Sequence, residues 1–105
     1  MDLNNKRFPP LLMRVQVKFL ASLYEVTKVL KTELDLPDGA TIRDLIQAID
    51  QRVSPNFSKV ILDDGKLKDQ YVILVNGRSV DFLNGLSTKL SNGDEVVFLP
   101  PAGGG

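Results

Sequence analysis

The fold can be worked out from residues 91–101, which read SNGDEVVFLPP. The first four of these residues are turn formers, and the apolar run after Glu95 alternates between two faces, as a half-buried strand does. Pro100 and Pro101 then lack the N–H groups that a strand needs, so strand pairing must stop there. The sequence therefore predicts a last strand that leads straight into the C-terminal tail.

Four further strands are predicted upstream from alternating patterns, short apolar runs and turn signals. The first two are expected to pair as a hairpin across a loop at residues 21–28, and the third reads as a strand covered on both faces. Asn76-Gly77, the strongest two-residue hairpin signal, joins the third strand to the fourth. These strands are residues 14–20 (RVQVKFL), 29–36 (VLKTELDL), 71–75 (YVILV) and 78–81 (RSVD).

One helix is predicted between the second and third strands. Thr41 supplies an N-cap hydroxyl, and Asp44 follows three residues later, as in a capping box. Ser54-Pro55 ends the helix, because a proline disfavours helical geometry in the residue before it. Apolar residues recur at helical spacing and form the stripe expected to lie across the sheet: Ile42, Leu45, Ile46, Ile49 and Val53.

This order of elements predicts an α+β fold in which a sheet of four to five strands carries one main helix on one face. The 105 residues suffice for one domain, which we place at residues 13–99. Residues 1–12 are interpreted as a disordered, structurally dispensable leader, and residues 100–105 as a flexible tail. The face of the sheet away from the helix stays available to a partner.

Composition excludes several functions. Thirteen basic and thirteen acidic residues cancel, so no net field attracts nucleic acid or an anionic membrane. The chain has no cysteine and no histidine, which removes thiolate nucleophiles, imidazole bases and the commonest zinc ligands. No apolar run approaches the roughly 20 residues of a membrane span, so we expect a cytoplasmic protein. Charged residues 63–69 are interpreted as a solvated loop without metal or phosphate.

The C-terminal tail carries the chemistry. Its last residues, Ala102 to Gly105, have no branched or charged side chain and can enter a narrow passage. From Pro100 the tail reaches at most about 20 Å, enough to deliver the terminal carboxylate to a partner's active site. A carboxylate needs activation before it can donate an acyl group, and no phosphate-binding glycine loop is present. A second protein must therefore activate it.

These residues resemble the ubiquitin-like sulfur carriers of the β-grasp fold, closest to the small subunit of molybdopterin synthase. The resemblance covers residues 13–105 and includes RVQVKFLASLYE (14–25) and YVILVNGRSV (71–80). Its most specific part is the ending, where a family pattern fits without a gap. The matching residues are Gly93, Asp94, Glu95, Val96, Pro100, Pro101, Gly104 and Gly105. Leu99 departs from it, because an aromatic residue often precedes the prolines, and a contact made there is expected to be smaller.

The resemblance implies a mixed sheet and a carrier that is not itself an enzyme. An E1-like enzyme would adenylate Gly105 with ATP and magnesium, and a sulfurtransferase or cysteine desulfurase would supply persulfide sulfur to form a thiocarboxylate. Gly103 and Gly104 would thread the partner's channel. Pro100 and Pro101 would aim the tail, and Val97 and Leu99, on the sheet face away from the helix, would dock the partner. The chain itself would bind no cofactor or metal.

The acceptor of the sulfur stays open at this stage. The two prolines favour molybdopterin, with the synthase large subunit as partner, over thiamine synthesis or tRNA thiolation. A second class is a protein modifier that transfers the same activated glycine to lysines of target proteins. A third is an inert β-grasp interaction module, for which the glycines would be irrelevant.

Overall fold

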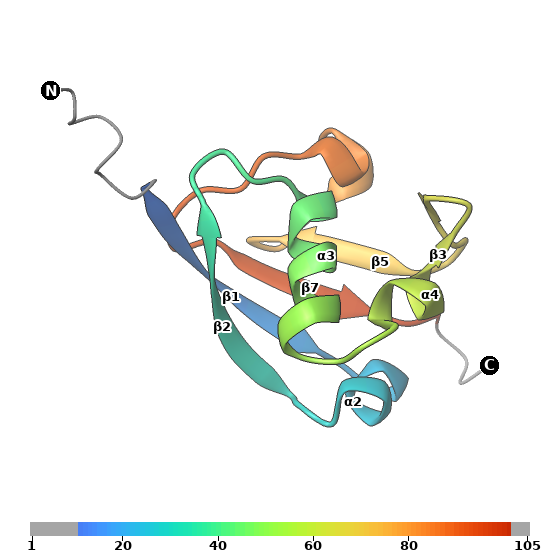
Figure 1. The fold of residues 1–105 in the computed structure, drawn as a ribbon. Helices are drawn as coiled ribbons and strands as arrows, with labels where there is room; N and C mark the ends of the chain where they lie inside the picture. Colours follow the sequence, from blue (N-terminus) through green and yellow to red (C-terminus); the bar gives the residue numbers. More distant parts are fainter. Residues whose placement is uncertain (1–10, 102–105) are drawn as a thin grey trace, which may run out of the picture.

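The structure is a computed structural model that describes residues 11–101. Its main sheet has five strands in the order β2-β1-β7-β5-β6, with β7 in the centre (Figure 1). β1 runs parallel to β7 and every other pair is antiparallel, so the sheet is mixed. The strands are β1 (Leu12–Phe19), β2 (Lys31–Pro37), β5 (Val72–Val75), β6 (Arg78–Ser79) and β7 (Glu95–Leu99). The predicted α+β architecture is confirmed.

The main helix, α3 (Ile42–Arg52), lies across one face of this sheet (Figure 1). Its N-terminus has the predicted capping box: the Asp44 N–H donates to Thr41 Oγ1 at 3.3 Å, and the Thr41 N–H donates to Asp44 Oδ2 at 2.9 Å. The predicted apolar stripe faces the sheet and is buried except for Val53, which is half-buried. The core therefore lies between α3 and the inward residues of the strands.

The prediction of a loop between the first two strands is wrong, because residues Ser22–Thr27 form a short helix, α2. Two residues of this helix, Leu23 and Thr27, lie four positions apart and are both buried. Ala21 before the helix has a φ of 52° and Lys28 after it a φ of 62°. Six residues are too few to show a helical period of apolar side chains in the sequence. Burial of two side chains in the tertiary structure therefore decides that this segment is helical.

Residues 54–70 also contain more structure than predicted. A short helix, α4 (Phe57–Ile61), leads into a hairpin of β3 (Leu62–Asp63) and β4 (Lys66–Leu67). α4 is held in place because Phe57 packs against aromatic side chains of two neighbouring strands, β1 and β7. The Phe57 ring lies 5.3 Å from that of Phe19 and 5.2 Å from that of Phe98, both edge to face.

The hairpin at Asn76-Gly77 is confirmed, and positive φ angles of 51° and 85° at these residues match the turn type that such a pair favours. Two details differ from prediction. β5 is covered on one face only, since Ile73 and Val75 are buried while Val72 and Leu74 are half-buried. β6 stops at Ser79, because the Ser79 hydroxyl accepts a hydrogen bond from the Asp81 N–H and starts a 3-10 turn.

That turn, η1 (Val80–Phe82), is followed by a second one, η2 (Gly85–Ser87). At the other end of the fold, β1 starts at Leu12, one residue before the predicted domain boundary. Residues 1–10 of the predicted leader lie outside the described residues, and their disorder stays a prediction. None of the helices within residues 11–101 is long and apolar enough to cross a membrane.

Candidate functional site

The tail leaves the sheet at its centre. β7 pairs with β1 on one side, up to Phe19 opposite Phe98, and with β5 on the other, up to Val72 opposite Leu99. As predicted, the strand ends at Leu99, and Pro100 follows without an N–H to continue the pairing. The end of β7 is thereby held between β1 and β5, so the tail starts from the middle of the sheet (Figure 1).

The predicted docking residues fall on the expected face. Val97 and Leu99 are half-buried on the face away from α3, whereas Val96 and Phe98 point into the core and are at most 1% exposed. Pro100 and Pro101 are half-buried beyond the end of the strand. Gly103, Gly104 and Gly105 lie outside the described residues, so their roles stay predictions from the sequence.

Two residues that the sequence interpretation had assigned to the core complete this surface. Val72 lies opposite Leu99, and Leu74 lies opposite Val97, in the antiparallel register of β5 with β7. We call these four half-buried residues the apolar strip. Leu20 borders it, since the Leu20 N–H donates to the Phe98 carbonyl at 3.2 Å. The sequence YVILV could not reveal the strip, because it is apolar throughout and only strand pairing brings residues 72 and 99 together.

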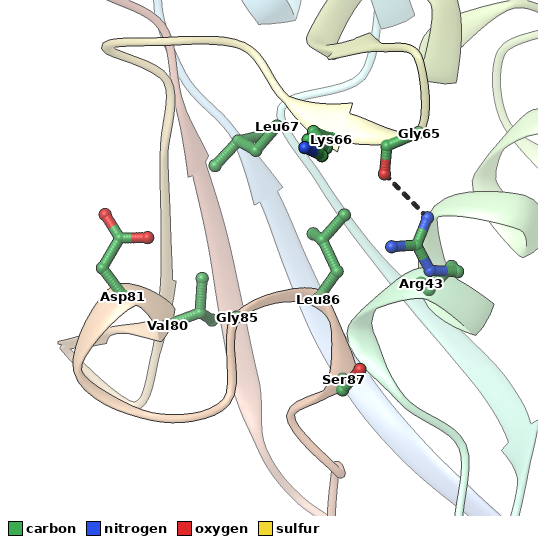
Figure 2. Close-up of a pocket in the computed structure, with 9 residues that line it drawn as sticks. All are labelled: Arg43, Gly65, Lys66, Leu67, Val80, Asp81, Gly85, Leu86 and Ser87. Atoms are coloured by element: carbon green, nitrogen blue, oxygen red, sulfur yellow. Dashed lines mark hydrogen bonds between the residues drawn. The ribbon is translucent and has the colours of Figure 1, made fainter.

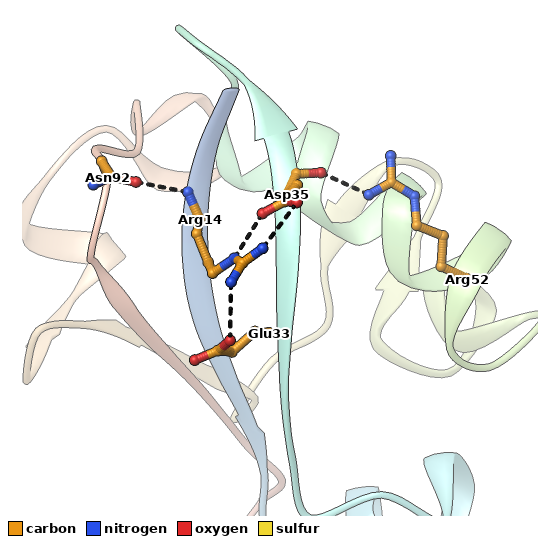
Figure 3. A network of polar contacts seen from close by, with 5 residues as sticks. All are labelled: Arg14, Glu33, Asp35, Arg52 and Asn92. Carbon is orange, nitrogen blue, oxygen red and sulfur yellow. Dashed lines mark hydrogen bonds and ion pairs between the residues drawn. The ribbon is translucent and has the colours of Figure 1, made fainter. Parts of the chain in front are cut away.

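The other half of the same sheet face is charged. Arg14 on β1 donates to both carboxylate oxygens of Asp35 on β2, at 2.9 and 3.3 Å, and lies 3.7 Å from Glu33 (Figure 3). Figure 3 also shows Asn92 accepting from the Arg14 N–H at 2.8 Å and Arg52 donating to the Asp35 carbonyl at 2.6 Å. These contacts fix the edge strand β2 against its neighbours.

Charged side chains on this face are paired with one another, both in the charged half and at its border with the apolar strip. The hydrogen bonds from Arg14 hold the pKa of Asp35 below its usual value, and the same contacts raise the pKa of Arg14. At the border, Lys18 Nζ lies 3.0 Å from Glu95 Oε2, beside Val97 in the register of β1 with β7. A partner that covers the apolar strip therefore meets a satisfied polar rim, the usual anatomy of a protein interface.

Within residues 11–101, no group of three or more carboxylates or other ligating side chains could hold a metal ion. Asp94 and Glu95, which precede the strip, are engaged in turn and strand contacts. The described arrangement offers a surface for a partner beside the strand that leads into the tail, while the role of Gly105 stays a prediction from the sequence.

Comparisons with known proteins agree with this geometry. The sequence model of the ThiS family matches residues 17–105. A protein of Archaeoglobus fulgidus, provisionally assigned as a sulfur carrier, is 37% identical over 93 residues, covering 89% of this chain and 100% of that protein. Small archaeal modifier protein 3 of Haloferax volcanii is 31% identical over 93 residues, with the same coverage of 89% and 100%.

A solved structure shares the fold. The provisionally assigned molybdopterin converting factor subunit 1 of Pyrococcus furiosus is 34% identical and aligns with a TM-score of 0.70. The alignment covers 86% of this chain and 99% of that one. This likeness confirms the predicted β-grasp fold.

Proposed function

This chain belongs to the ThiS family of non-catalytic sulfur carriers, and from that premise we propose that its Gly105 carboxylate carries sulfur for molybdopterin synthesis. One observation carries the proposal. The central strand β7 ends beside the apolar strip, and the chain continues from there through Pro100 and Pro101 to a terminus of three glycines. The docking surface and the start of the tail are therefore adjacent, and the two prolines stiffen the segment that leads on toward Gly105.

The chemistry takes place on the partners of this chain. In an E1-like enzyme, an oxygen of the Gly105 carboxylate attacks the α-phosphorus of magnesium-bound ATP, and pyrophosphate leaves. The terminal sulfur of a sulfurtransferase or cysteine desulfurase persulfide then attacks the acyl carbon and expels AMP, which forms an acyl disulfide. A second thiol attacks the donor's sulfur, and the chain departs as a thiocarboxylate. ATP and persulfide are cytoplasmic reagents, which places the cycle in the cytoplasm.

The tail suits this sequence of partners. Glycines allow the backbone to pass where any side chain would clash, and the prolines keep the segment extended. The apolar strip supplies the binding energy, since burying four half-exposed aliphatic side chains gives a favourable hydrophobic contribution. The same surface can serve successive partners, because the activating enzyme and the synthase large subunit must both reach the terminus.

Conjugation to protein lysines is the second candidate function. It is supported by the 31% identity to small archaeal modifier protein 3, whose name describes that protein as a modifier. The step differs only in the nucleophile. A lysine amine of the target attacks the carbonyl of the acyl-adenylate, the bond to the phosphate breaks, and AMP and the amine proton leave, so that an isopeptide bond forms instead of a thiocarboxylate. The fold and the terminus serve both reactions equally well.

The experiment that tests the carrier reaction uses the full chain with ATP and magnesium, the E1-like enzyme of the same genome and a persulfide-loaded sulfurtransferase. Intact mass and fragmentation of the C-terminal peptide locate the product. Fragmentation is needed because replacing oxygen by sulfur gives the same nominal mass change as oxidising Met1 or Met13. A chain lacking Gly104 and Gly105 is the matched control, since deleting Gly105 alone would leave another pair of glycines at the end.

Sulfur on Gly105 of the full chain, and none on the shortened chain, supports the carrier. Conjugates on lysines with an unmodified free terminus support the modifier instead. No reaction with a partner proven active on another carrier overturns both. The molybdopterin assignment is tested separately by single-turnover transfer from the thiocarboxylated chain to the precursor bound by the synthase large subunit, and transfer only to tRNA or to a thiamine precursor overturns it.

A further inference from the structure

A second surface, unrelated to the tail, lies where α3, the β3–β4 hairpin and the two 3-10 turns meet (Figure 2). These segments form the walls of an open cleft of about 320 Å³. Leu67, Val80 and Leu86 supply its apolar lining. Figure 2 shows Asp81 at the η1 end and Arg43 at the α3 end, where the Arg43 guanidinium donates to the Gly65 carbonyl at 3.0 Å. The cleft is therefore apolar inside and oppositely charged at its two ends.

Next to this cleft stands the most exposed large hydrophobic residue within residues 11–101. Phe82, which follows Asp81 on η1, is 83% exposed. The turn that carries it is closed at both ends: the Asp81 N–H donates to Ser79 Oγ at 3.2 Å, and the Leu83 N–H donates to the Val80 carbonyl at 2.9 Å. A fixed, exposed aromatic side chain is the type of residue that anchors protein interfaces.

We propose that this surface pairs with itself, so that two copies form a symmetric dimer in which Phe82 of each copy enters the cleft of the other. A two-fold axis applies the same contact twice, and it requires a patch that carries both a projecting group and the hollow that receives it. Phe82 and the cleft meet this requirement. The cleft is large enough, because an engineered cavity of about 150 Å³ already holds benzene.

Charge complementarity points to the same occupant. Asp81 precedes Phe82 on η1 and therefore travels with it into the second copy. There it approaches the cationic side of the cleft, formed by Arg43 and Lys66. The reciprocal contact occurs at the other end, so each dimer gains two such pairs. The net charge of the chain is zero, and no overall repulsion opposes the association.

The dimer leaves the apolar strip uncovered. None of the residues of the apolar strip lines the cleft, and the cleft belongs to α3 and the turns that follow β6. Each copy contributes one aromatic side chain and one cleft, a small contact, so we expect an association that is weak and depends on concentration. It would present two carriers on one particle with both apolar strips uncovered, and it stands whether or not Gly105 carries sulfur.

Sedimentation equilibrium of the full chain, up to about 1 mM, tests the proposal. The expected result is a monomer–dimer equilibrium in which Phe82→Ala lowers the association constant at least about tenfold, as loss of a central aromatic anchor does. Tyr24→Ala is the matched control, since Tyr24 is an exposed aromatic residue on α2, and it should leave association unchanged. A monomer throughout, or a dimer that survives Phe82→Ala, overturns the proposal.

A charge exchange tests the pairing itself. Asp81→Lys and Lys66→Glu should each weaken self-association, up to about fivefold, because each places like charges together twice. A mixture of the two variants should form heterodimers as strongly as the unchanged chain. In such a heterodimer the introduced lysine faces the introduced glutamate at one contact, and the unchanged Asp81 faces the unchanged Lys66 at the other. Native mass spectrometry distinguishes the species, and a mixture no stronger than the separate variants contradicts the two-fold arrangement.

Discussion

Asn76 and Asp94 tie two turns together at the start of the central strand. Asn76 Nδ2 donates to Asp94 Oδ1 at 2.9 Å, and Asn76 Oδ1 accepts from the Glu95 N–H at 2.9 Å. The second oxygen of Asp94 accepts from the Ser91 N–H at 2.8 Å. The pair therefore joins the β5–β6 turn to the turn before β7 and sets the register in which β7 enters the sheet, which in turn sets where the tail leaves.

Asp94→Ala removes both hydrogen bonds of this carboxylate at once. We expect the free energy of unfolding to fall by about 1–2 kcal/mol, the magnitude of lost hydrogen bonds to a charged group near the surface. Urea denaturation followed by circular dichroism measures it. Asp63→Ala in the exposed β3–β4 hairpin is the control and should change stability little; equal losses in the two variants would contradict the anchoring role.

Val97→Asp and Leu99→Asp place a charge within the apolar strip. Because both side chains are half-buried on the sheet face away from the core, the fold should survive while docking weakens. We expect KM for the chain in ATP-dependent activation by the E1-like enzyme to rise about tenfold or more, with the thermal midpoint nearly unchanged. Gln47→Asp, on the exposed side of α3, is the control and should be activated normally. If Val97→Asp and Leu99→Asp are also activated normally, the strip has no docking role.

Phe98→Ala should be among the most damaging substitutions. The Phe98 ring stacks on Phe19 at 5.6 Å and meets Phe57 edge to face at 5.2 Å, and it is 1% exposed. Removal of a buried phenyl ring costs about 3–5 kcal/mol, a large part of the roughly 5–15 kcal/mol that stabilises a typical domain.

Chemical denaturation with Phe98→Leu as the companion variant checks this expectation. Leucine keeps much of the buried volume, so it should lose clearly less stability than alanine does. A loss below about 1 kcal/mol for Phe98→Ala would mean that the aromatic cluster does not support the root of the tail.

The ion pair of Arg14 and Asp35 predicts a dependence of stability on pH. The pKa of Asp35 is lowered on folding, chiefly by the hydrogen bond from Arg14, so its stabilisation is fully present above the unfolded pKa and is lost as the pH falls through the folded one. Below about pH 4, the thermal midpoint of the unchanged chain should therefore fall more steeply than that of Asp35→Asn.

Thermal scans between about pH 7 and pH 2, at low and high salt, measure this difference. The other carboxylates contribute equally to both proteins and cancel in the comparison. Because the pair is exposed, added salt should reduce the difference between the two proteins. Parallel curves at low salt would show that Asp35 gains nothing from Arg14 on folding.

Much of the fold follows from local patterns in the chain. The stripe of α3, its capping box, the Asn76-Gly77 turn and the end of β7 before Pro100 each depend on residues within a few positions of one another, and all are found as predicted. α2 and α4 were missed because six and five residues carry no readable period. Their conformation depends on partners distant in sequence, such as Phe19 and Phe98 for Phe57 in α4.

The same distinction holds for function. The chemistry proposed for the terminus comes from the sequence alone, because Gly103, Gly104 and Gly105 bring a main-chain carboxylate and no reactive side chain. The surfaces were decided only by the tertiary structure. The apolar strip joins residues 72 and 99 through strand register, and the cleft beside Phe82 joins Arg43 to Leu86 through packing. Such juxtapositions arise from contacts between distant segments, which no local pattern encodes.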